Sequence, residues 1–388
     1  MLPLPQEGAS RIYRQHHAHD RRPHHGMTMA SAGTAPLAAG LRTGIARRWH
    51  GLPRPLRIVL ARISLIPPQL FGVLLVTFVL VRLLPGDPAL LLLGNMATPD
   101  AIASLRQRLG LDQGLWTQFV RYLGRVLHGD LGTSIFTSHP VVQDLIERAP
   151  ATLELISYAM IVTVVAGVGL AVLSVTARGR FFDYFTRAYG LAAGALPDFW
   201  VGLLLIFFLY HIAGWAPPPF GRLDTYLTAP RTITGFYTLD SLLAGNWADL
   251  GSATGRLVLP VATISIVNTG AMMKMTQTVF AGVYDSAFIR HARASGLPQR
   301  RIVAMALKNS LPPIITTAGF LFGFLLGAAV LVETIFSWGG LGQYAVQAVI
   351  NSDYPALQGF VMVAAIFVLL VYLVVDVLYE LVDPRIQI

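Results

Sequence analysis

Long apolar runs recur along the chain, and each is long enough to cross a lipid bilayer as a helix. At a rise of about 1.5 Å per residue, roughly 20 residues cross a hydrocarbon core about 30 Å thick. We place the predicted spans at residues 63–84, 153–177, 188–213, 257–280, 313–333 and 357–379. The pattern predicts an all-α integral membrane protein, with six transmembrane helices packed in one bundle within residues 58–388.

The segment before the first span, residues 1–57, has no apolar face long enough to bury, because proline, glycine, histidine and arginine alternate there. This composition is typical of disorder, and we predict a basic, disordered cytoplasmic tail. Five of its histidines are candidate metal ligands: His16, His17, His19, His24 and His25. A flexible tail fixes no coordination geometry, so we favour a solvated tail over a metal site.

Arginines gather in alternate connections of the predicted bundle. They precede the first span, lie between the second and third spans at Arg178 and Arg180, and fill the fourth connection. Because Lys and Arg concentrate in cytoplasmic loops, we expect this face and both chain termini in the cytoplasm. The segment 85–152 is then a sizeable periplasmic loop, and its amphipathic stretch at 99–127 predicts a helix outside the membrane.

The composition agrees with a membrane protein, since 54% of the residues are hydrophobic and 13% are charged. We assign the net charge of +9 to cytoplasmic loops and lipid contact rather than to nucleic-acid binding. The absence of cysteine excludes disulfides, cysteine-ligated zinc and iron–sulfur clusters. The chain also lacks a Gly-x-x-x-x-Gly-Lys-Ser/Thr phosphate loop, His-Glu-x-x-His and Gly-x-Ser-x-Gly, so we expect neither ATP hydrolysis nor another enzyme activity.

The fourth connection, residues 281–312, is too long for a simple turn. Small residues at Ala292, Ala294 and Ser295 precede Gly296, and apolar residues at helical spacing follow it. We predict a helix, a turn at a glycine free to take positive φ, and a second helix. A short helix displaying small residues and arginines fits a groove in another protein. An interfacial helix with its arginines on anionic lipid fits the pattern equally well.

Ionisable and small residues inside the spans are further candidates for function or packing. Asp198 lies next to Pro197 within the third span, where it could face a substrate pathway. We favour an interhelical hydrogen bond for it, since polar groups in lipid commonly join helices. Gly319, Gly323 and Gly327 repeat at every fourth position, and such small residues allow two helices to approach closely.

Six short motifs occur in the order found in one family of transport proteins. They are Arg82-Leu83-Leu84-Pro85-Gly86-Asp87-Pro88, Gly129-Asp130-Leu131-Gly132, Leu196-Pro197-Asp198-Phe199-Trp200, Ala292-Arg293-Ala294-Ser295-Gly296-Leu297, Val332-Glu333-Thr334-Ile335-Phe336-Ser337-Trp338, and the pair Asp353-Tyr354-Pro355 and Asp383-Pro384-Arg385 around the sixth span. In these motifs the chain resembles the permease subunits of ABC importers of the dipeptide/oligopeptide group, over about residues 60–388. It departs from the general importer motif at Arg290, where Glu is usual, and at Asn309, where proline is usual.

The resemblance implies the type I ABC importer permease fold and a role as the membrane-spanning subunit of an ATP-driven importer. It implies partners of several kinds: a second homologous permease, two ATP-binding subunits, a periplasmic substrate-binding protein and the lipid of a bacterial inner membrane. ATP and Mg would be bound by the ATPase subunits, with no cofactor in this chain.

The resemblance also implies roles for particular residues. The ATPase-coupling loop would comprise Arg290, Ala292, Arg293, Ala294, Gly296, Leu297, Arg300 and Arg301. Pro197, Asp198 and Trp200 are candidates for the translocation pathway. The alternative is a secondary transporter driven by an ion gradient, which would need repeated halves that the sequence does not show. The solute stays open among dipeptides, oligopeptides, nickel complexes, glutathione and oligosaccharides.

Overall fold

The structure, a computed structural model, describes residues 54–83, 93, 98–109, 112–177 and 180–382. Most of the predicted tail, with its histidine cluster, lies outside the described residues. So do Arg178 and the part of the first motif that follows Leu83.

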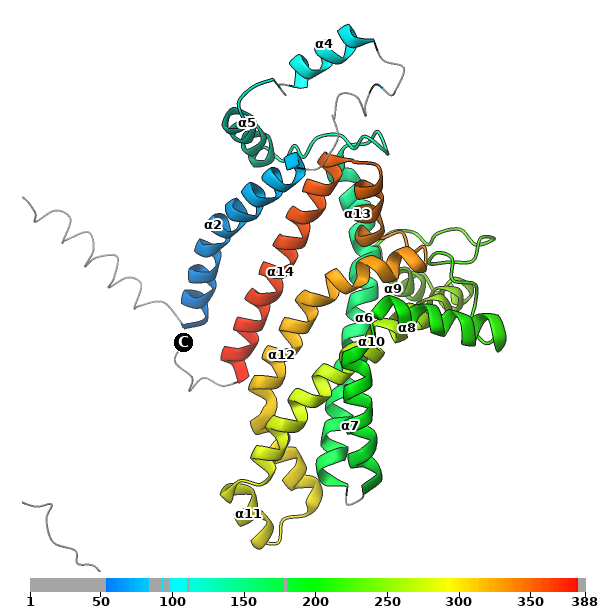
Figure 1. Cartoon of the computed structure of the whole chain (residues 1–388). Helices are drawn as coiled ribbons and strands as arrows, with labels where there is room; N and C mark the ends of the chain where they lie inside the picture. Colours follow the sequence, from blue (N-terminus) through cyan, green and yellow to red (C-terminus); the bar gives the residue numbers. More distant parts are fainter. Residues whose placement is uncertain (1–53, 84–92, 94–97, 110–111, 178–179, 383–388) are drawn as a thin grey trace, which may run out of the picture. The chain divides into compact units, whose positions relative to one another are not determined.

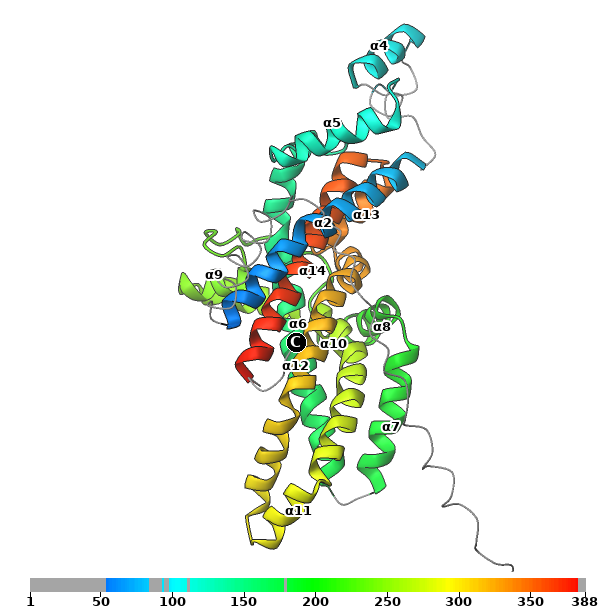
Figure 2. The same ribbon diagram turned by 90° about the vertical axis from the view of Figure 1, so that its left-hand side faces the viewer.

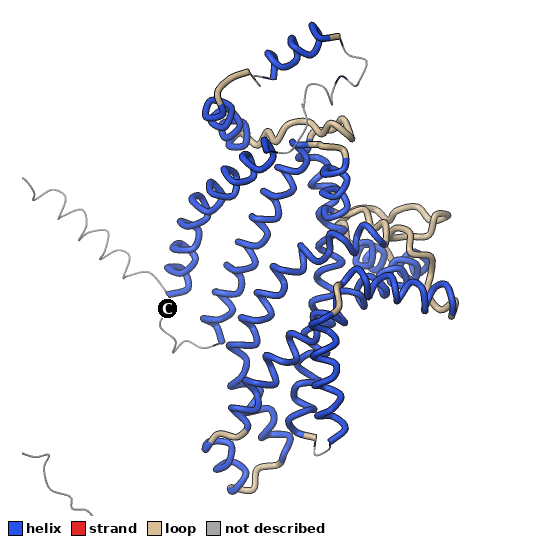
Figure 3. The backbone as a smooth tube through the Cα atoms, in the orientation of Figure 1, coloured by secondary structure: helices blue, strands red, loops and turns tan. Residues whose placement is uncertain are grey.

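The described residues form helices joined by loops, and no strand occurs among them (Figure 3). The long helices are α2 (Arg54–Leu83), α6 (Val141–Thr176), α10 (Trp247–Tyr284), α12 (Gln299–Ile335) and α14 (Tyr354–Val382). The shorter elements are α4 (Pro99–Leu109), α5 (Leu115–Leu127), α7 (Arg180–Ala195), α8 (Asp198–Leu205), the π-helix η1 (Ile206–Ile212), α9 (Tyr237–Leu243), α11 (Ala287–Ala294) and α13 (Leu341–Ile350). The prediction of an all-α protein is confirmed.

Five described helices are long and apolar enough to cross a membrane, and a bent helix pair brings the number to as many as six. The bent pair consists of α7 followed by α8 and η1, and it turns by 106°. The predicted third span, 188–213, is therefore two helices at a sharp angle rather than one continuous helix. Pro197 causes the break, because it has no N–H to donate and disfavours helical geometry at Leu196.

Three of the long helices extend well beyond the apolar runs that predicted them. α6, α10 and α12 have 36, 38 and 37 residues, or about 55 Å each. α12 runs without interruption through Pro312 and Pro313, where the sequence pattern places the boundary between the fourth connection and the fifth span. One continuous helix thus joins the fourth connection to the opposite end of the bundle.

A buried apolar cluster holds α6, α10 and α12 side by side. Leu155 and Ile156 of α6, Ile264 of α10 and Leu325 of α12 are fully buried in it. α2 and α14 pack against each other beside these three helices (Figures 1 and 2). The transmembrane helices therefore form one bundle, as the apolar pattern predicts.

An ion pair and an amphipathic helix fix the position of α2. Arg62 of α2 lies 2.6 Å from Asp376 of α14, measured from Nε to Oδ2. Phe119 and Tyr122 of α5 are buried against Leu74 of α2 and its neighbours. The amphipathic stretch predicted after the first span is present as α4 and α5, and α5 covers one end of α2.

The three glycines of the predicted packing stripe have different surroundings on α12. A Cβ atom added at Gly319 would overlap Val375 of α14, so the two helices approach closely there. Gly323 lies at ordinary contact distance from Val368, since an added Cβ would be 3.8 Å from its side chain. At Gly327 an added Cβ would meet nothing within 4 Å in the described chain. A contact between the rest of this stripe and another subunit stays a prediction.

Candidate functional site

The short helix α11 lies at one end of the bundle, between α10 and α12 (Figures 1 and 2). Its N-terminus is capped by the hydroxyl of Ser286, which accepts the N–H of Ile289 at 3.4 Å. After its last turn, Gly296 takes φ +74°. The N–H groups of Leu297 and Gly296 donate to the carbonyl oxygens of Ala292 and Arg293, at 3.3 and 3.1 Å. This Schellman turn requires positive φ, which explains the glycine.

The two faces of α11 differ in burial. Ile289 is buried in a cluster with Phe280 of α10 and Ile302 of α12, and Ala292 is buried on the same helix. The opposite face and the turn that follows are exposed, including Arg290, Arg293, Ala294, Gly296, Arg300 and Arg301. Of the eight residues expected in the coupling loop, Ala292 and Leu297 therefore pack inward, while the other six lie on one open surface.

The arginines of this surface make few contacts with other described side chains. The guanidinium of Arg293 lies 5.1 Å from the centroid of the Tyr284 ring. Arg290, Arg300 and Arg301 have no ion-pair partner among the described residues. The exposed surface formed by α11 and the first turn of α12 thus offers cationic groups that no carboxylate among the described residues neutralises.

The pathway candidates lie at the bend between α7 and α8, apart from α11 (Figure 1). Asp198 is partly buried, and the Nδ2 of Asn268 on α10 donates to its Oδ1 at 3.4 Å. This is an interhelical hydrogen bond of the kind favoured for Asp198 from its sequence position. Pro197 and Trp200 are exposed in this chain. The structure does not bring these three residues together with the coupling residues.

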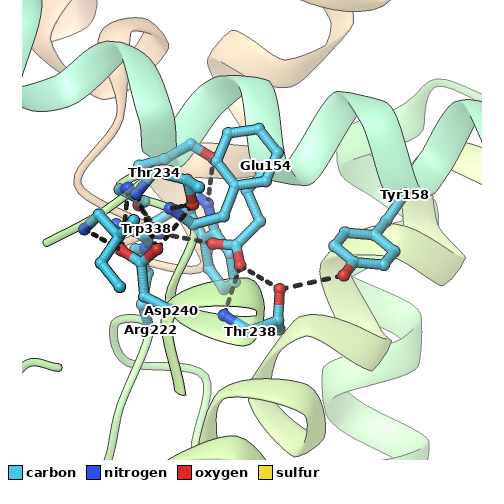
Figure 4. Close-up of polar contacts among 11 residues, drawn as sticks. Glu154, Tyr158, Arg222, Thr234, Thr238, Asp240 and Trp338 are labelled. Atoms are coloured by element: carbon cyan, nitrogen blue, oxygen red, sulfur yellow. Dashed lines mark hydrogen bonds and ion pairs between the residues drawn. The ribbon is translucent and has the colours of Figure 1, made fainter. Parts of the chain in front are cut away.

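Figure 4 shows a polar network that the sequence analysis did not single out, centred on Glu154, Arg222, Thr238 and Asp240. Glu154 of α6 is 1% exposed. Its Oε1 accepts the N–H and the hydroxyl of Thr238 at 2.9 and 2.6 Å, and its Oε2 accepts Arg222 Nη2. The Tyr158 hydroxyl lies 3.1 Å from that of Thr238. These contacts tie α6 to α9 and to the connection between η1 and α9.

A second buried carboxylate, Glu333, fixes α13 against the end of α12. Its Oε1 accepts the hydroxyl of Thr152 at 2.6 Å, and its Oε2 accepts the N–H of Gln343 at 3.1 Å. A Cβ atom at Gly340 would lie within 2.6 Å of both carboxylate oxygens, so only glycine, which has no side chain, fits at this position. The Trp338 indole N–H donates to the carbonyl oxygen of Ala151 at 2.9 Å and closes the same region.

Two aspartates outside the membrane-spanning segments are held in their charged form. Burial opposes the charge of Asp240, but hydrogen bonds from residues 233–235 outweigh this effect and hold the pKa of Asp240 below its usual value. Arg256 donates to Asp224 through Nε and Nη2 at 3.0 and 2.6 Å. These hydrogen bonds, with one from Ser252, lower the pKa of Asp224.

Of the residues in this polar region, Glu154 could have been singled out from the sequence. Glu154 stands inside the predicted span 153–177, and an ionisable residue within a span is costly and hence a candidate for function. Arg222 and Asp240 lie in polar connections, where nothing in the local pattern separates them from ordinary surface residues. Their roles become visible only once the chain is folded.

Comparison with known proteins decides the class to which this arrangement belongs. A family described as binding-protein-dependent transport system inner membrane component matches residues 163–388, and a family describing the N-terminal part of such components matches residues 56–156. The chain belongs to this family. It is the permease subunit of an ABC importer: a multi-pass inner-membrane protein that carries out transport and is not an enzyme. The resemblance carried by the six motifs is confirmed.

Relatives of the permease align along most of its length. The probable D,D-dipeptide transport system permease DdpB of Escherichia coli is 42% identical over 317 residues, covering 81% of this chain and 93% of the relative. The dipeptide permease DppB of E. coli is 36% identical over 336 residues, covering 86% and 99%. The di/tripeptide permease DppB of Pseudomonas aeruginosa is 38% identical over 335 residues, with the same coverage. Nothing in these comparisons supports the alternative of an ion-gradient-driven transporter.

Family membership implies that the permease works with other ABC transporter components, in general a second permease, an ATPase and a binding protein. The described residues show no cofactor site of their own. No group of three or more His, Asp or Glu side chains among them could hold a metal ion.

Proposed function

We propose that this permease imports short peptides, together with a second homologous permease, two ATP-binding subunits and a periplasmic substrate-binding protein. The names of three relatives, aligned over 93–99% of their lengths, refer to the transport of dipeptides or of di- and tripeptides. ATP and Mg belong to the ATPase subunits in this proposal. α11 and both termini face the cytoplasm of a bacterial cell.

The short connections of α11 and its packing against α10 and α12 are the main support for a role of this helix in coupling. Two residues, Asp285 and Ser286, connect it to α10, and the Gly296 turn connects it to α12. Its inner face packs on both helices through the apolar cluster of Phe280, Ile289 and Ile302. A force applied to α11 is therefore transmitted to α10 and α12 rather than absorbed in a loop.

Because α10 and α12 are long enough to cross the membrane, a force applied to α11 would also move their far ends. Each helix is about 55 Å long, so displacement at the α11 end also displaces the opposite end, where Glu333 joins α12 to α13. Asn268 on α10 contacts Asp198 at the broken third span. Movement of α10 would change this contact, which supports Pro197, Asp198 and Trp200 as part of the pathway that opens and closes.

The charge of α11 supports an acidic partner surface on the ATPase subunits. Arg290, Arg300 and Arg301 are exposed and unpaired within the described chain. Complementary charge across an interface directs association and fixes its register. The ATP-binding subunits would thus supply the carboxylates that this chain does not.

The orientation is testable because the chain contains no cysteine, so an introduced one is a unique label site. Ser295→Cys, next to α11, should react with a membrane-impermeant maleimide only after cells are permeabilised. Thr225→Cys, at the opposite end, should react in spheroplasts that are still intact. The reverse pattern would contradict the proposed orientation.

Reconstitution tests the transport function itself. Proteoliposomes containing the purified complex should accumulate radiolabelled L-alanyl-L-alanine only with ATP on the α11 side and binding protein on the opposite side. Uptake by this chain alone, driven by a proton or sodium gradient without ATP, would contradict the proposal.

A further inference from the structure

A polar cavity of about 390 Å³ lies at the end of the permease opposite α11. Residues of α6, the segment 222–229, Tyr237 and the turn Trp338–Gly339 line it. Small-molecule sites in proteins have volumes of about 300–1,000 Å³. The cavity is therefore large enough for a small solute, and the proposed coupling role of α11 does not involve it.

Opposite charges line this cavity. Arg222 contributes a guanidinium, and Glu147 contributes a carboxylate from α6. Positions 147, 151 and 154 share one face of α6, because they are spaced by four and three residues. Ala151 lines the cavity with only a methyl group and leaves space between the two glutamates. The free carboxylate of Glu147 and the Glu154 that holds Arg222 are thus about 10 Å apart along the helix axis.

Arg222 is held rigidly but is not fully satisfied. Its Nη2 donates to Glu154 and to the carbonyl oxygen of Gly235, the latter at 2.8 Å. Its guanidinium carbon lies 3.6 Å from the centroid of the Tyr237 ring. Its Nε is buried and has no hydrogen-bond partner among the described residues. Buried donors are almost always paired in native proteins, so this one calls for an acceptor that the described chain does not supply.

Glu147 is the carboxylate of the cavity that stays available to a ligand. Asp224 also lines the cavity, but its Oδ1 is already occupied by Arg256. The side chain of Glu147 is exposed, and its only described partner is the neutral amide of Gln143, at 2.9 Å. The cavity thus presents one carboxylate without a cation and one guanidinium without a full set of acceptors.

We propose that this cavity binds the zwitterionic main chain of a short peptide, with the carboxylate at Arg222 and the ammonium group at Glu147. A guanidinium fixed in place suits a carboxylate, because little side-chain freedom is lost on binding. The site would receive the peptide on the outer side before it enters the membrane pathway. This inference rests on peptide import as the proposed function and adds a binding site within the permease itself.

Binding of L-alanyl-L-alanine to the purified complex in nanodiscs, without binding protein, tests the site by isothermal titration calorimetry. Glu147→Gln removes the carboxylate from an exposed position and should leave folding unchanged. We expect it to weaken binding by about tenfold or more, the effect of losing one charged hydrogen bond. Gln143→Ala, which removes only the neighbour of Glu147, should bind the peptide like the unmodified complex.

Capped peptides test the two ends of the site without altering the protein. N-acetylation should weaken binding to the unmodified complex and abolish the difference made by Glu147→Gln. Amidation of the carboxyl end should weaken binding to both forms, because Arg222 is present in each. Equal affinity of capped and free peptides, equal affinity of Glu147→Gln and Gln143→Ala, or no binding at all would overturn the inference.

Uptake assays separate this inference from the proposed function. If peptide import proceeds normally in Glu147→Gln at limiting peptide, the permease imports peptides but the cavity is not a binding site. If the unmodified system imports no peptide, the proposed function itself is wrong, and the inference falls with it.

Discussion

Toward the α13 end of the permease, Glu154 and Glu333 are buried and hydrogen-bonded within the chain, whereas at the α11 end several arginines are exposed and have no ion-pair partner in the part of the chain that the structure describes. Glu154 and Glu333 are at most 1% exposed, and each accepts hydrogen bonds from a neighbouring element. At the other end, Arg300 and Arg301, in the first turn of α12 next to α11, have no ion-pair partner among the described residues. The buried carboxylates at one end thus have their partners within the chain, whereas the exposed arginines at the other end find no carboxylate among the described residues.

This difference indicates what each end depends on. A buried carboxyl group must be hydrogen-bonded or paired with a cation, because an uncompensated polar group or charge away from water is destabilising. The α13 end is therefore stabilised by contacts within the chain. Removing one partner of a buried carboxylate there should lower the free energy of unfolding. An exposed arginine costs the isolated chain little and is available to another protein. Substitution of the exposed arginines at the α11 end should leave the stability of the isolated chain unchanged. It should instead weaken the assembly of the chain with its partner subunits.

The largest effect on stability is expected for Glu154→Ala. The substitution leaves the partly buried Arg222 without its counter-ion and Thr238 without its acceptor. Loss of one partner of a buried ion pair costs about 3–5 kcal/mol. The midpoint of thermal unfolding of the purified chain in detergent, followed by size-exclusion chromatography, should fall sharply.

Glu147→Ala is the matched control on the same face of α6, two turns away. Because the Glu147 side chain is exposed, the unfolding midpoint of the Glu147→Ala variant should stay close to that of the unmodified chain. Equal destabilisation by the two substitutions would show that the buried network does not hold this end together.

Gly319→Leu should have the next largest effect. An added side chain overlaps Val375 of α14, and overpacking of a close helix contact costs about 1–3 kcal/mol. Gly327→Leu on the same helix has open space and should leave the unfolding midpoint of the isolated chain unchanged. If the two variants unfold alike, the approach of α12 to α14 is not tight.

Asp224→Asn should have a smaller effect that depends on pH. Because Arg256 and Ser252 lower the pKa of Asp224, the charged form stabilises the fold above the unfolded-state pKa of about 3.9. This contribution disappears as pH falls through the lower pKa of the folded state. The unmodified chain and the variant should therefore differ in unfolding midpoint at neutral pH and converge below about pH 4. A difference that does not change with pH would contradict the ion pair.

The smallest effect on folding is expected for Arg300→Glu combined with Arg301→Glu. These side chains are exposed and form no ion pair with another described residue, so the isolated chain should unfold as before. Co-purification of the ATP-binding subunits should nevertheless fall, because like charges would meet at the interface. Arg300→Lys with Arg301→Lys keeps the charge and serves as the control. Retention of the subunits by the Glu variant would show that α11 does not face an acidic surface.

The sequence predicts the bundle well because lipid imposes a simple rule. Every backbone polar group in the membrane must be satisfied within a helix, so a long apolar run has one solution. The Gly296 turn is predicted for a similar reason, since few residues adopt positive φ without strain. α11 and its short connections follow from these two local constraints.

The features that the sequence does not predict depend on contacts between distant segments. The bend at Pro197 has a local cause, but its angle of 106° is set by the packing of α8 on α10 and α12. Arg222 meets Glu154 across 68 positions of the chain, and Thr152 meets Glu333 across 181. The hydrophobic pattern along the sequence does not indicate which of such distant polar residues will be in contact. Gly319, Gly323 and Gly327 look equivalent in the sequence, yet only Gly319 makes a tight contact within the described chain.

The measurement that tests the coupling role most directly is peptide-stimulated ATP hydrolysis by the purified complex carrying Gly296→Val or Gly296→Asn. An added Cβ at Gly296 meets no other group within 4 Å, so the two variants differ from the unmodified chain mainly in backbone strain at φ +74°. Asn tolerates positive φ, whereas β-branched Val does not. We predict that stimulation by loaded binding protein is lost in Gly296→Val and largely retained in Gly296→Asn. Full stimulation in Gly296→Val, with all subunits bound, would contradict the account of α11 as the element that couples ATP hydrolysis to transport.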